Sequence, residues 1–342
     1  FHWVAEFYEI MHNGGFDVII GNPPYVEYPS SDVTYSLDHF ESAKCGNLYG
    51  NCIERAMQIL SEQGKFSFIV PVAITCSRRM EKVINILKSN SSYLYFADFD
   101  DRPGKLFEMI QHLRASIIIS ARDKEHDVKI YSTKYNRWYT EHRSLLFDNL
   151  RFVEVTKFCN SFTIPKFSYP IENSINEKLQ STNRTIASTY QSNSSNKVYY
   201  RAAGGGYFLL IKNSKSITYI NGNLENVKAE KSICINSIYS NNSIGAILSS
   251  SLFYWNYIAY TDCRNLQKSF IDNFHIFNDV KKGCDVLCSF GKDLFDDYEK
   301  NKFTKSTHYK TTGNDVVYDE YYPKLSKSFI DRIDEKLGSL YD

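Results

Sequence analysis

The residues with the clearest potential for chemistry are Asn22, Pro23, Pro24 and Tyr25, which follow the apolar run FDVII and Gly21. An Asn side-chain carbonyl beside a backbone carbonyl can accept both N–H bonds of an amino group whose lone pair is delocalised. These acceptors would orient the nitrogen and favour the charge that develops on it in the transition state. Pro23 fixes the backbone so that its carbonyl points into the site, and Tyr25 offers a ring face for a planar base. The pattern therefore predicts methyl transfer to an exocyclic or amide nitrogen.

The elements around this motif predict how it is held. Residues 16–20 are a short continuous apolar run before two prolines, which is typical of a buried strand that ends in a stiff loop. Helical spacing of apolar residues from Asn47 predicts a helix with Asn47 as its N-cap and Gly64 at its C-terminal end. Residues 65–70 predict the next strand.

The alternation of strands and helices continues to about residue 130. A second amphipathic helix is predicted at residues 77–88, and the further predicted strands are 93–99, 113–120 and 128–131. Such alternation implies crossover connections and a largely parallel sheet, with ligands at the carboxyl ends of the strands. We therefore predict an α/β fold for the first 130–150 residues.

The pattern changes after residue 150. Residues 181–197 are polar and rich in Ser and Asn, which predicts an exposed connection. Short strands are predicted at 198–201, 207–211, 217–220 and 232–238, followed by an apolar helix at 244–260. A polar, aromatic stretch then runs to the end, so this half is expected to be mixed α+β.

Several segments together resemble a known family. FDVIIGNPPYVEY is similar to motif IV of the amino-methyltransferases that use S-adenosylmethionine. The segments that narrow the resemblance are 47–49, 53–60, 64–71, 101–107, 199–205, 249–276 and 322–326. They resemble the adenine-specific DNA methyltransferases of the gamma arrangement, in particular the methyltransferase and target-recognition portion of type IIG restriction–modification enzymes. The resemblance implies the C-terminal half of a Rossmann-like methyltransferase sheet followed by a target-recognition domain.

The resemblance also implies roles for individual residues. Asn22 and Pro23 would hold the amino group of a flipped adenine, and Tyr25 would stack on one face of the base. Phe107 matches the position that closes the other face, although a core Phe beside Leu106 and Met109 is an equal alternative. Flipping is required because a duplex hides the target nitrogen. The methyl donor would be S-adenosylmethionine, and Asp17 and Gly21 are the residues expected near it.

One part of the family pattern is not found. Such enzymes carry a Gly-rich loop after their first strand, followed by an acidic residue for the cofactor ribose, upstream of motif IV. Twenty-one residues precede Asn22, and neither Gly14-Gly15 nor Gly204–Gly206 has the strand–loop–helix context of a cofactor cradle. Together with the absence of an initial methionine, this predicts a C-terminal fragment that binds S-adenosylmethionine poorly and is inactive alone. The missing N-terminal half would hold the cofactor site and would also hold any nuclease domain.

Charge distribution favours DNA as the partner of the second half. The formal net charge of the chain is +1, but residues 1–150 carry 16 Lys/Arg and 19 Asp/Glu, whereas residues 151–282 carry 15 and 8. The candidate contacts to double-stranded DNA are Arg201, Lys212, Lys215, Arg264, Asn265, Gln267 and Lys268.

The sequence gives little support for a metal-binding, membrane-spanning or secreted protein. The eight cysteines and eight histidines show no metal-ligand spacing, so no metal is predicted, and the cysteines are expected to be free thiols. No run approaches the roughly 20 apolar residues of a membrane helix, and no secretory signal is present. A cytoplasmic protein of a bacterium or archaeon is expected.

The preferred hypothesis is site-specific adenine-N6 DNA methylation within a restriction–modification or phage-defence enzyme. Its parts would be a partial methyltransferase catalytic domain at 1–150, a DNA target-recognition domain at 151–300 and the tail of the recognition region at 301–342. The first alternative is a catalytically silent DNA-binding specificity module. The second is a methyltransferase that acts on RNA or on protein glutamine, because such enzymes also use the N-P-P-Y sequence.

Overall fold

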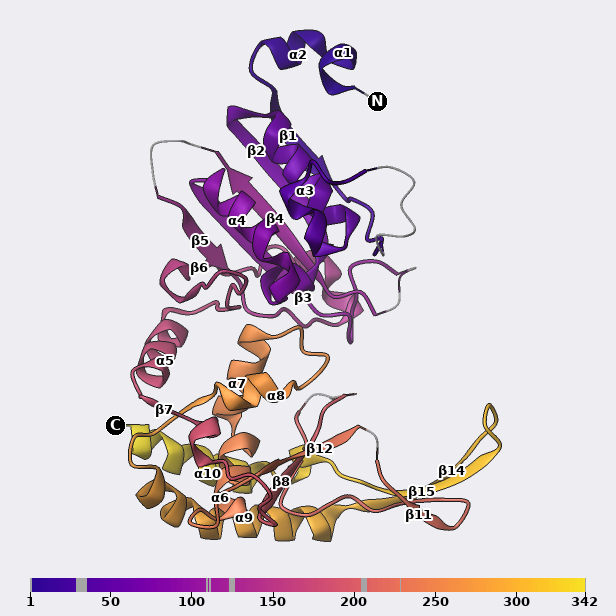
Figure 1. Ribbon diagram of the computed structural model, residues 1–342, viewed down its shortest axis with the longest axis vertical. Coiled ribbons are helices and arrows are strands. Elements are labelled where there is room, and N and C mark those ends of the chain that lie inside the picture. The colour runs from indigo at the N-terminus through magenta and orange to yellow at the C-terminus, as the bar shows by residue number, and fades with distance from the viewer. Residues whose placement is uncertain are drawn as a thin grey trace. The chain divides into compact units, whose positions relative to one another are not determined.

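The protein is described from a computed structural model that covers residues 2–28, 36–108, 110, 112–122, 127–203, 208–227 and 229–341. The predicted features at Gly204–Gly206 and Tyr207 lie outside the described residues. The chain divides into two compact units (Figure 1), one formed by residues 1–174 and 258–262 and the other by residues 175–257 and 263–342.

Unit 1 is built on a six-stranded sheet. In spatial order its strands are β1 (Phe16–Gly21), β2 (Leu60–Pro71), β4 (Ala115–Ala121), β3 (Tyr93–Phe99), β5 (Lys129–Ser132) and β6 (Val153–Glu154). Two of its strand pairs, β1 with β2 and β3 with β5, are parallel, while β4 runs antiparallel between β2 and β3. The α/β class is confirmed, but the sheet is mixed rather than largely parallel. The reason is that β3 connects to β4 through a loop instead of a crossover helix.

Two helices cover one face of this sheet (Figure 1): α3 (Leu48–Ile59) and α4 (Glu81–Ser89). The prediction for the start of α3 is confirmed, because the Asn47 side chain accepts a hydrogen bond from the Tyr49 amide at 3.3 Å. The prediction for its end is wrong. The helix ends at Ile59, and Gly64 lies inside β2. Short helices α1 (Trp3–Glu6) and α2 (Tyr8–His12) precede β1.

The opposite face of the sheet is open near β1. Val18 and Ile20 point to this face and are 57% and 77% exposed, and Ile119 on β4 is 45% exposed. Strand β1 is also at the end of the strand order, paired with β2 alone among the described residues. The strand predicted at 16–20 is therefore confirmed, but its predicted burial is wrong, because the described residues supply no strand at its second edge and no helix over Val18 and Ile20.

Unit 2 combines helices with three small sheets. Its strands are β7 (Arg184–Thr185), β8 (Lys197–Arg201), β9 (Ile211–Lys212), β10 (Thr218–Ile220), β11 (Asn223–Glu225), β12 (Glu230–Cys234), β13 (His275–Ile276), β14 (Phe303–Tyr309) and β15 (Asn314–Glu320). They form the orders β11-β10-β15-β14, β12-β8-β9 and β13-β7. Its helices are α6 (Asn241–Ser249), α7 (Ser251–Tyr260), α8 (Lys268–Asp272), α9 (Val280–Asn301) and α10 (Lys327–Tyr341). Helix α5 (Pro170–Gln180) crosses the boundary between the units.

Three local expectations for this half need correction. The apolar stretch 244–260 forms two helices, because Ser250 adopts an extended conformation between α6 and α7. The segment 181–197 is more than an exposed connection, since it holds β7 and the fully buried Ile186 and Thr189. The stretch after α7 contains the 22-residue helix α9.

Membrane insertion through a helix finds no support in the described part of the chain. None of its helices is both long and apolar enough to cross a bilayer.

Candidate active site

The segment Asn22–Tyr25 lies at the carboxyl end of β1, beside the carboxyl end of the parallel strand β2. Gly21 pairs with Phe68, which brings the segment next to the last residues of β2. Asn22 is exposed, Pro23 is buried and Tyr25 is half-buried. The motif is therefore anchored by its proline and presents its Asn outward, at the sheet edge where α/β proteins bind ligands.

The Tyr25 hydroxyl is directed at two carbonyl oxygens. It lies within hydrogen-bond distance of Asn22 Oδ1 and 2.8 Å from the backbone oxygen of Ile69. Burial raises the pKa of Tyr25 to about 12, so the hydroxyl keeps its proton at neutral pH. One hydroxyl has a single proton to donate. Two acceptors thus converge on the Tyr25 hydroxyl, whose single proton serves one of them at a time.

Backbone pairing fixes the segment that follows the motif. The Leu48 amide donates to the Val26 carbonyl at 3.0 Å, and the Tyr28 amide donates to the Gly46 carbonyl at 3.2 Å. Glu27 forms an ion pair with Arg79 at the start of α4. The start of α3 and the exit of the motif are therefore held together, so the Asn47 cap also supports the site.

The ring of Tyr25 packs edge-on against Tyr49, with 6.4 Å between ring centroids and an interplanar angle of 86°. Tyr49 is buried, and its hydroxyl donates to Met80 Sδ at 3.2 Å. Burial raises the pKa of Tyr49 as well. Both phenols are neutral and fixed, which suits stacking and hydrogen bonding rather than proton abstraction.

A largely apolar cavity of about 520 Å³ lies beside the motif. Its lining comes from β1, the motif, β2 and α3, together with Trp3 and Phe40. The residues are Trp3, Ile19, Ile20, Gly21, Asn22, Pro23, Pro24, Phe40, Leu48, Asn51, Cys52, Arg55, Ala56, Ile59 and Phe68. The cavity therefore lies along the same strand, β1, that has an unpaired edge among the described residues.

The two residues expected near the methyl donor are separated. Gly21 lines the cavity, but Asp17 lies toward the amino end of β1 and accepts a hydrogen bond from Ser61 Oγ at 3.2 Å. No group of three His, Cys, Asp or Glu side chains suited to a metal ion occurs in the described ranges. Of the two residues expected near the methyl donor, Gly21 therefore lies beside the motif, and Asp17 is not part of the cavity lining.

Phe107 lies in the loop that connects β3 to β4. Because β3 runs in the same direction as β1 and β2, this loop leaves the same edge of the sheet as the motif. Phe107 is half-buried. Its assignment as the residue that closes the second face of a base remains a prediction.

The candidate DNA contacts of unit 2 fall into two groups. Ala203 pairs with Asn265, and the Leu266 amide donates to the Ala202 carbonyl at 3.0 Å. This pairing brings Arg201 beside the exposed residues Arg264, Asn265 and Gln267, so residues 60 positions apart form one surface. Lys268 is also exposed, but its ammonium is 2.9 Å from both carboxylate oxygens of Asp272.

The remaining two lysines lie elsewhere. Lys215 is exposed after β9 and donates to Asn226. Lys212 corrects the sequence-based prediction, because it is 3% exposed, 3.4 Å from Glu299 Oε1 and 3.8 Å from the ring centroid of Tyr321. Burial lowers the pKa of Lys212. This lysine packs inside unit 2 and presents no charge to a DNA backbone.

Sequence reasoning missed two parts of the site. The first is the Ile69 carbonyl, which accepts a hydrogen bond from the Tyr25 hydroxyl. The strand predicted at 65–70 could have pointed to this carbonyl, since adjacent parallel strands end at the same edge of a sheet. The second is a buried ionic cluster, Asp100 and Asp101 with Arg114 and Arg137, at the carboxyl end of β3. Charged residues in a loop give no sequence signal of burial.

Comparison with known proteins identifies relatives of this arrangement. Residues 1–106 match the family model described as Eco57I restriction-modification methylase. No curated protein matches the chain.

Among solved structures, the chain is similar to the Type IIL restriction-modification enzyme MmeI in complex with DNA. The TM-score is 0.52 at 10% identity, covering 95% of this chain and 54% of that one. A nuclease-deletion mutant of the Type ISP enzyme LlaGI with a DNA substrate mimic gives a TM-score of 0.45 at 11% identity, covering 91% and 47%. A class I S-adenosylmethionine-dependent methyltransferase from Listeria monocytogenes gives 0.24 at 21% identity, covering 34% and 37%.

The chain thus spans about half or less of the length of these solved structures. The likeness to MmeI shows the fold. The family match includes the motif Asn22–Tyr25, so residues 1–106 are similar to the restriction-modification methylases of that family model.

Proposed function

We propose that this relative of the restriction–modification methyltransferases transfers a methyl group from S-adenosylmethionine to N6 of adenine in double-stranded DNA, as part of a larger enzyme. The observation that carries the proposal is the convergence of Asn22 Oδ1 and the Ile69 carbonyl on the Tyr25 hydroxyl. When the Tyr25 hydroxyl donates to Ile69, the Asn22 oxygen and the Pro23 carbonyl are the two acceptors proposed for the two N–H bonds of an amino group. They would stabilise the charge on its nitrogen as the methyl group arrives.

Each motif residue has a role in this proposal. Asn22 accepts one amino proton, and Pro23 holds the backbone so that its own carbonyl accepts the other. Tyr25 and Phe107 close on the two faces of the flipped base. The Tyr25 hydroxyl lies within hydrogen-bond distance of the Asn22 oxygen. An adenine amino group that enters the site would replace this hydrogen bond, and the Tyr25 hydroxyl would then donate to the Ile69 carbonyl.

The cofactor would be held by a further stretch of polypeptide that completes the sheet. Strand β1 has an unpaired edge among the described residues, its outward face exposes Val18 and Ile20, and the apolar cavity adjoins it. Open strand edges and apolar patches are features that proteins cover. A strand added beside β1 and a helix packed on Val18 and Ile20 would satisfy both, and we expect a nuclease domain, where one is present, in the same additional polypeptide.

DNA would be recognised mainly by residues 151–300, with 301–342 as the tail of that region and 1–150 as the partial catalytic domain. The surface formed by Arg201, Arg264, Asn265 and Gln267 supports this, because it combines phosphate-binding and base-reading side chains. The protein would work in the cytoplasm of a bacterium or archaeon.

The test begins with the chain itself. Selection of duplexes from a random pool should enrich one sequence that contains adenine, whereas titration with S-adenosylmethionine should give no saturable binding. The full product of the reading frame should then methylate that adenine at N6, measured by mass spectrometry of the digested DNA. Micromolar binding of S-adenosylmethionine to the chain alone would refute the need for a further polypeptide.

The same assays separate the alternative of a silent specificity module. That module would enrich a sequence, but the full product would transfer no methyl group to it. Methylation of RNA or of a protein glutamine, with no enriched duplex, would instead support the other substrate classes.

A further inference from the structure

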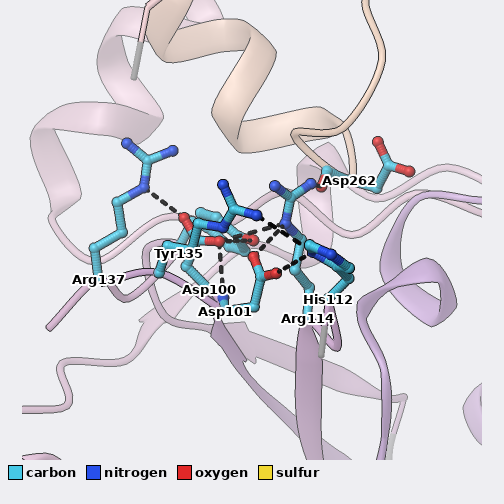
Figure 2. Close-up of polar contacts among 8 residues, drawn as sticks. Asp100, Asp101, His112, Arg114, Tyr135, Arg137 and Asp262 are labelled. Atoms are coloured by element: carbon cyan, nitrogen blue, oxygen red, sulfur yellow. Dashed lines mark hydrogen bonds and ion pairs between the residues drawn. The ribbon is translucent and has the colours of Figure 1, made fainter. Parts of the chain in front are cut away.

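The loop between β3 and β4, residues 100–114, carries Phe107 and is fastened at both ends by buried charges. Arg114 Nε lies 3.3 Å from Asp100 Oδ1 and 3.2 Å from Asp101 Oδ1, and Arg137 Nε lies 2.7 Å from Asp100 Oδ2 (Figure 2). Both carboxylates are buried. The first residues of the loop are thus tied to its last residue.

Neighbouring groups complete this cluster. The Tyr135 hydroxyl donates to Asp100 at 3.0 Å, and Arg114 Nη1 donates to the Asp262 carbonyl at 2.9 Å (Figure 2). Burial works to raise the pKa of Asp101, but its hydrogen bonds and the Arg114 guanidinium outweigh this, so the pKa is lowered and the carboxylate stays charged. The ends of the loop are therefore rigid at neutral pH.

The middle of the loop is held by the segment that follows β5. The Gly104 amide donates to the Trp138 carbonyl at 2.7 Å, and a Cβ at Gly104 would lie 2.6 Å from the Trp138 ring nitrogen. Leu106 packs against the buried cluster of Ala97, Phe99, Trp138 and Leu146. The backbone on the N-terminal side of Phe107 thus has a fixed course.

Arg143, on the short helix η4 (Thr140–Leu145), contacts the backbone immediately before Phe107. Its guanidinium donates to the Lys105 carbonyl at 3.0 Å and to the Leu106 carbonyl at 2.9 Å. These are the two peptide carbonyls immediately before Phe107. A planar guanidinium can hold two oxygens at once, which the single ammonium of Lys does less well.

We propose that Arg143 is a positioning residue for the target base: it holds the backbone before Phe107 so that the ring meets a flipped adenine in one fixed pose. This rests on the proposed function, in which Phe107 closes the second face of the base. Arg143 does not touch the base. It acts by lowering the cost of ordering Phe107 when the base arrives.

The experiment uses the chain with the duplex that it selects from a random pool, in which 2-aminopurine replaces the target adenine. Emission of 2-aminopurine rises when the base leaves the stack, so it reports flipping, and fluorescence anisotropy reports DNA affinity separately. We expect Arg143→Lys to reduce the emission of the fully bound duplex about fivefold while DNA affinity stays within about twofold. Arg143→Ala should behave like Arg143→Lys.

Glu141→Gln is the matched control, because Glu141 is exposed on the same short helix and has no hydrogen bond to a described residue of the loop. It should leave emission unchanged.

Unaltered emission in Arg143→Lys would overturn the proposal. A loss of DNA affinity in Arg143→Ala that Arg143→Lys restores would also overturn it, since that result would make Arg143 a phosphate contact. Absence of any selected duplex for the unmodified chain would refute the proposed function instead. Thermal unfolding of each variant checks that the fold is retained.

Discussion

Strands β1 and β3 belong to one sheet and are both rich in apolar residues, yet they have opposite surroundings. On β3, Leu94, Phe96 and Phe99 are fully buried between β4 and β5. On β1, Val18 and Ile20 are exposed, and β2 is the single strand that pairs with β1 among the described residues. Apolar side chains on a strand are ordinarily buried by a partner.

This difference distinguishes two parts of the sheet in unit 1. The part of the sheet around β3 is complete in itself and carries the buried charges that fasten the Phe107 loop. The part around β1 carries the motif Asn22–Tyr25 but leaves its strand partly uncovered. The candidate motif Asn22–Tyr25 therefore lies beside the part of the sheet that the described residues leave uncovered, which is where the proposed cofactor-bearing polypeptide would pack.

The largest expected effect tests the contrast directly. Leu94→Ala should lower the free energy of unfolding by about 3 kcal/mol, because it removes a fully buried side chain and leaves a cavity. Ile20→Ala should change it by less than about 0.5 kcal/mol, because the Ile20 side chain is 77% exposed. Urea denaturation of both variants measures this. Equal losses would show that β1 is buried in solution by something in the chain itself.

The second prediction concerns activity rather than stability. Asn22→Ala should lower the rate of methylation by the full enzyme about 100-fold, because it removes an acceptor for the charged transition state. Asn22 is exposed, so unfolding and duplex affinity should stay nearly unchanged. Val26→Ala is the control, since Val26 is also exposed, at 51%, and lies four residues away. A parallel loss of DNA affinity in Asn22→Ala would make Asn22 a structural or binding residue.

The sequence allows some of this to be predicted and not the rest. The strand predicted at 16–20, the Asn47 cap and the strand predicted at 93–99 depend on local patterns, and they are confirmed. The exposure of Ile20 and the burial of Lys212 depend on which distant segments arrive beside them, which one sequence does not reveal. The strand predicted at 113–120 is confirmed as β4, but its antiparallel direction does not follow from the sequence of the preceding loop.

Helix α9 is an instructive omission, because its signal was present. Cys284, Leu287, Leu294 and Tyr298 lie on one helical face and are buried, but glycines and charges interrupt the run. Gly291 has a packing reason, since a Cβ there would lie 2.0 Å from the Asn242 carbonyl oxygen on α6. A glycine that lowers helix propensity thus permits close contact between two helices.

The third prediction uses the buried carboxyl of Asp98 on β3. Burial raises the pKa of Asp98 to about 6 against the opposing effects of the Lys166 charge and the Ser116 hydroxyl. A raised pKa means that the native state favours the protonated acid. Stability from this group is therefore complete below the unfolded value of 3.8 and is lost as pH rises toward 6.

The measurement compares the pH profiles of the native chain and Asp98→Asn. The native free energy of unfolding should lose about 2 kcal/mol relative to the variant between pH 4 and 6.5. Asp17→Asn is the matched control, because it makes the same substitution at an exposed position of β1. Parallel profiles for native chain and Asp98→Asn would show that water or a partner reaches this carboxylate.

The smallest expected effect concerns helix α3, which covers the face of the sheet opposite to the exposed Val18 and Ile20 side chains. Asn47→Ala should lower the free energy of unfolding by about 1 kcal/mol, because the Tyr49 amide loses its acceptor at the start of α3. Asn47→Asp should restore most of it, since Asp caps helices equally well, and thermal unfolding would measure both. Because the Leu48 amide also holds the Val26 carbonyl, loss of the cap should increase hydrogen exchange at residues 26–28. If exchange there stays unchanged, the motif is held by Pro23 and β2 alone, and its rigidity does not depend on α3.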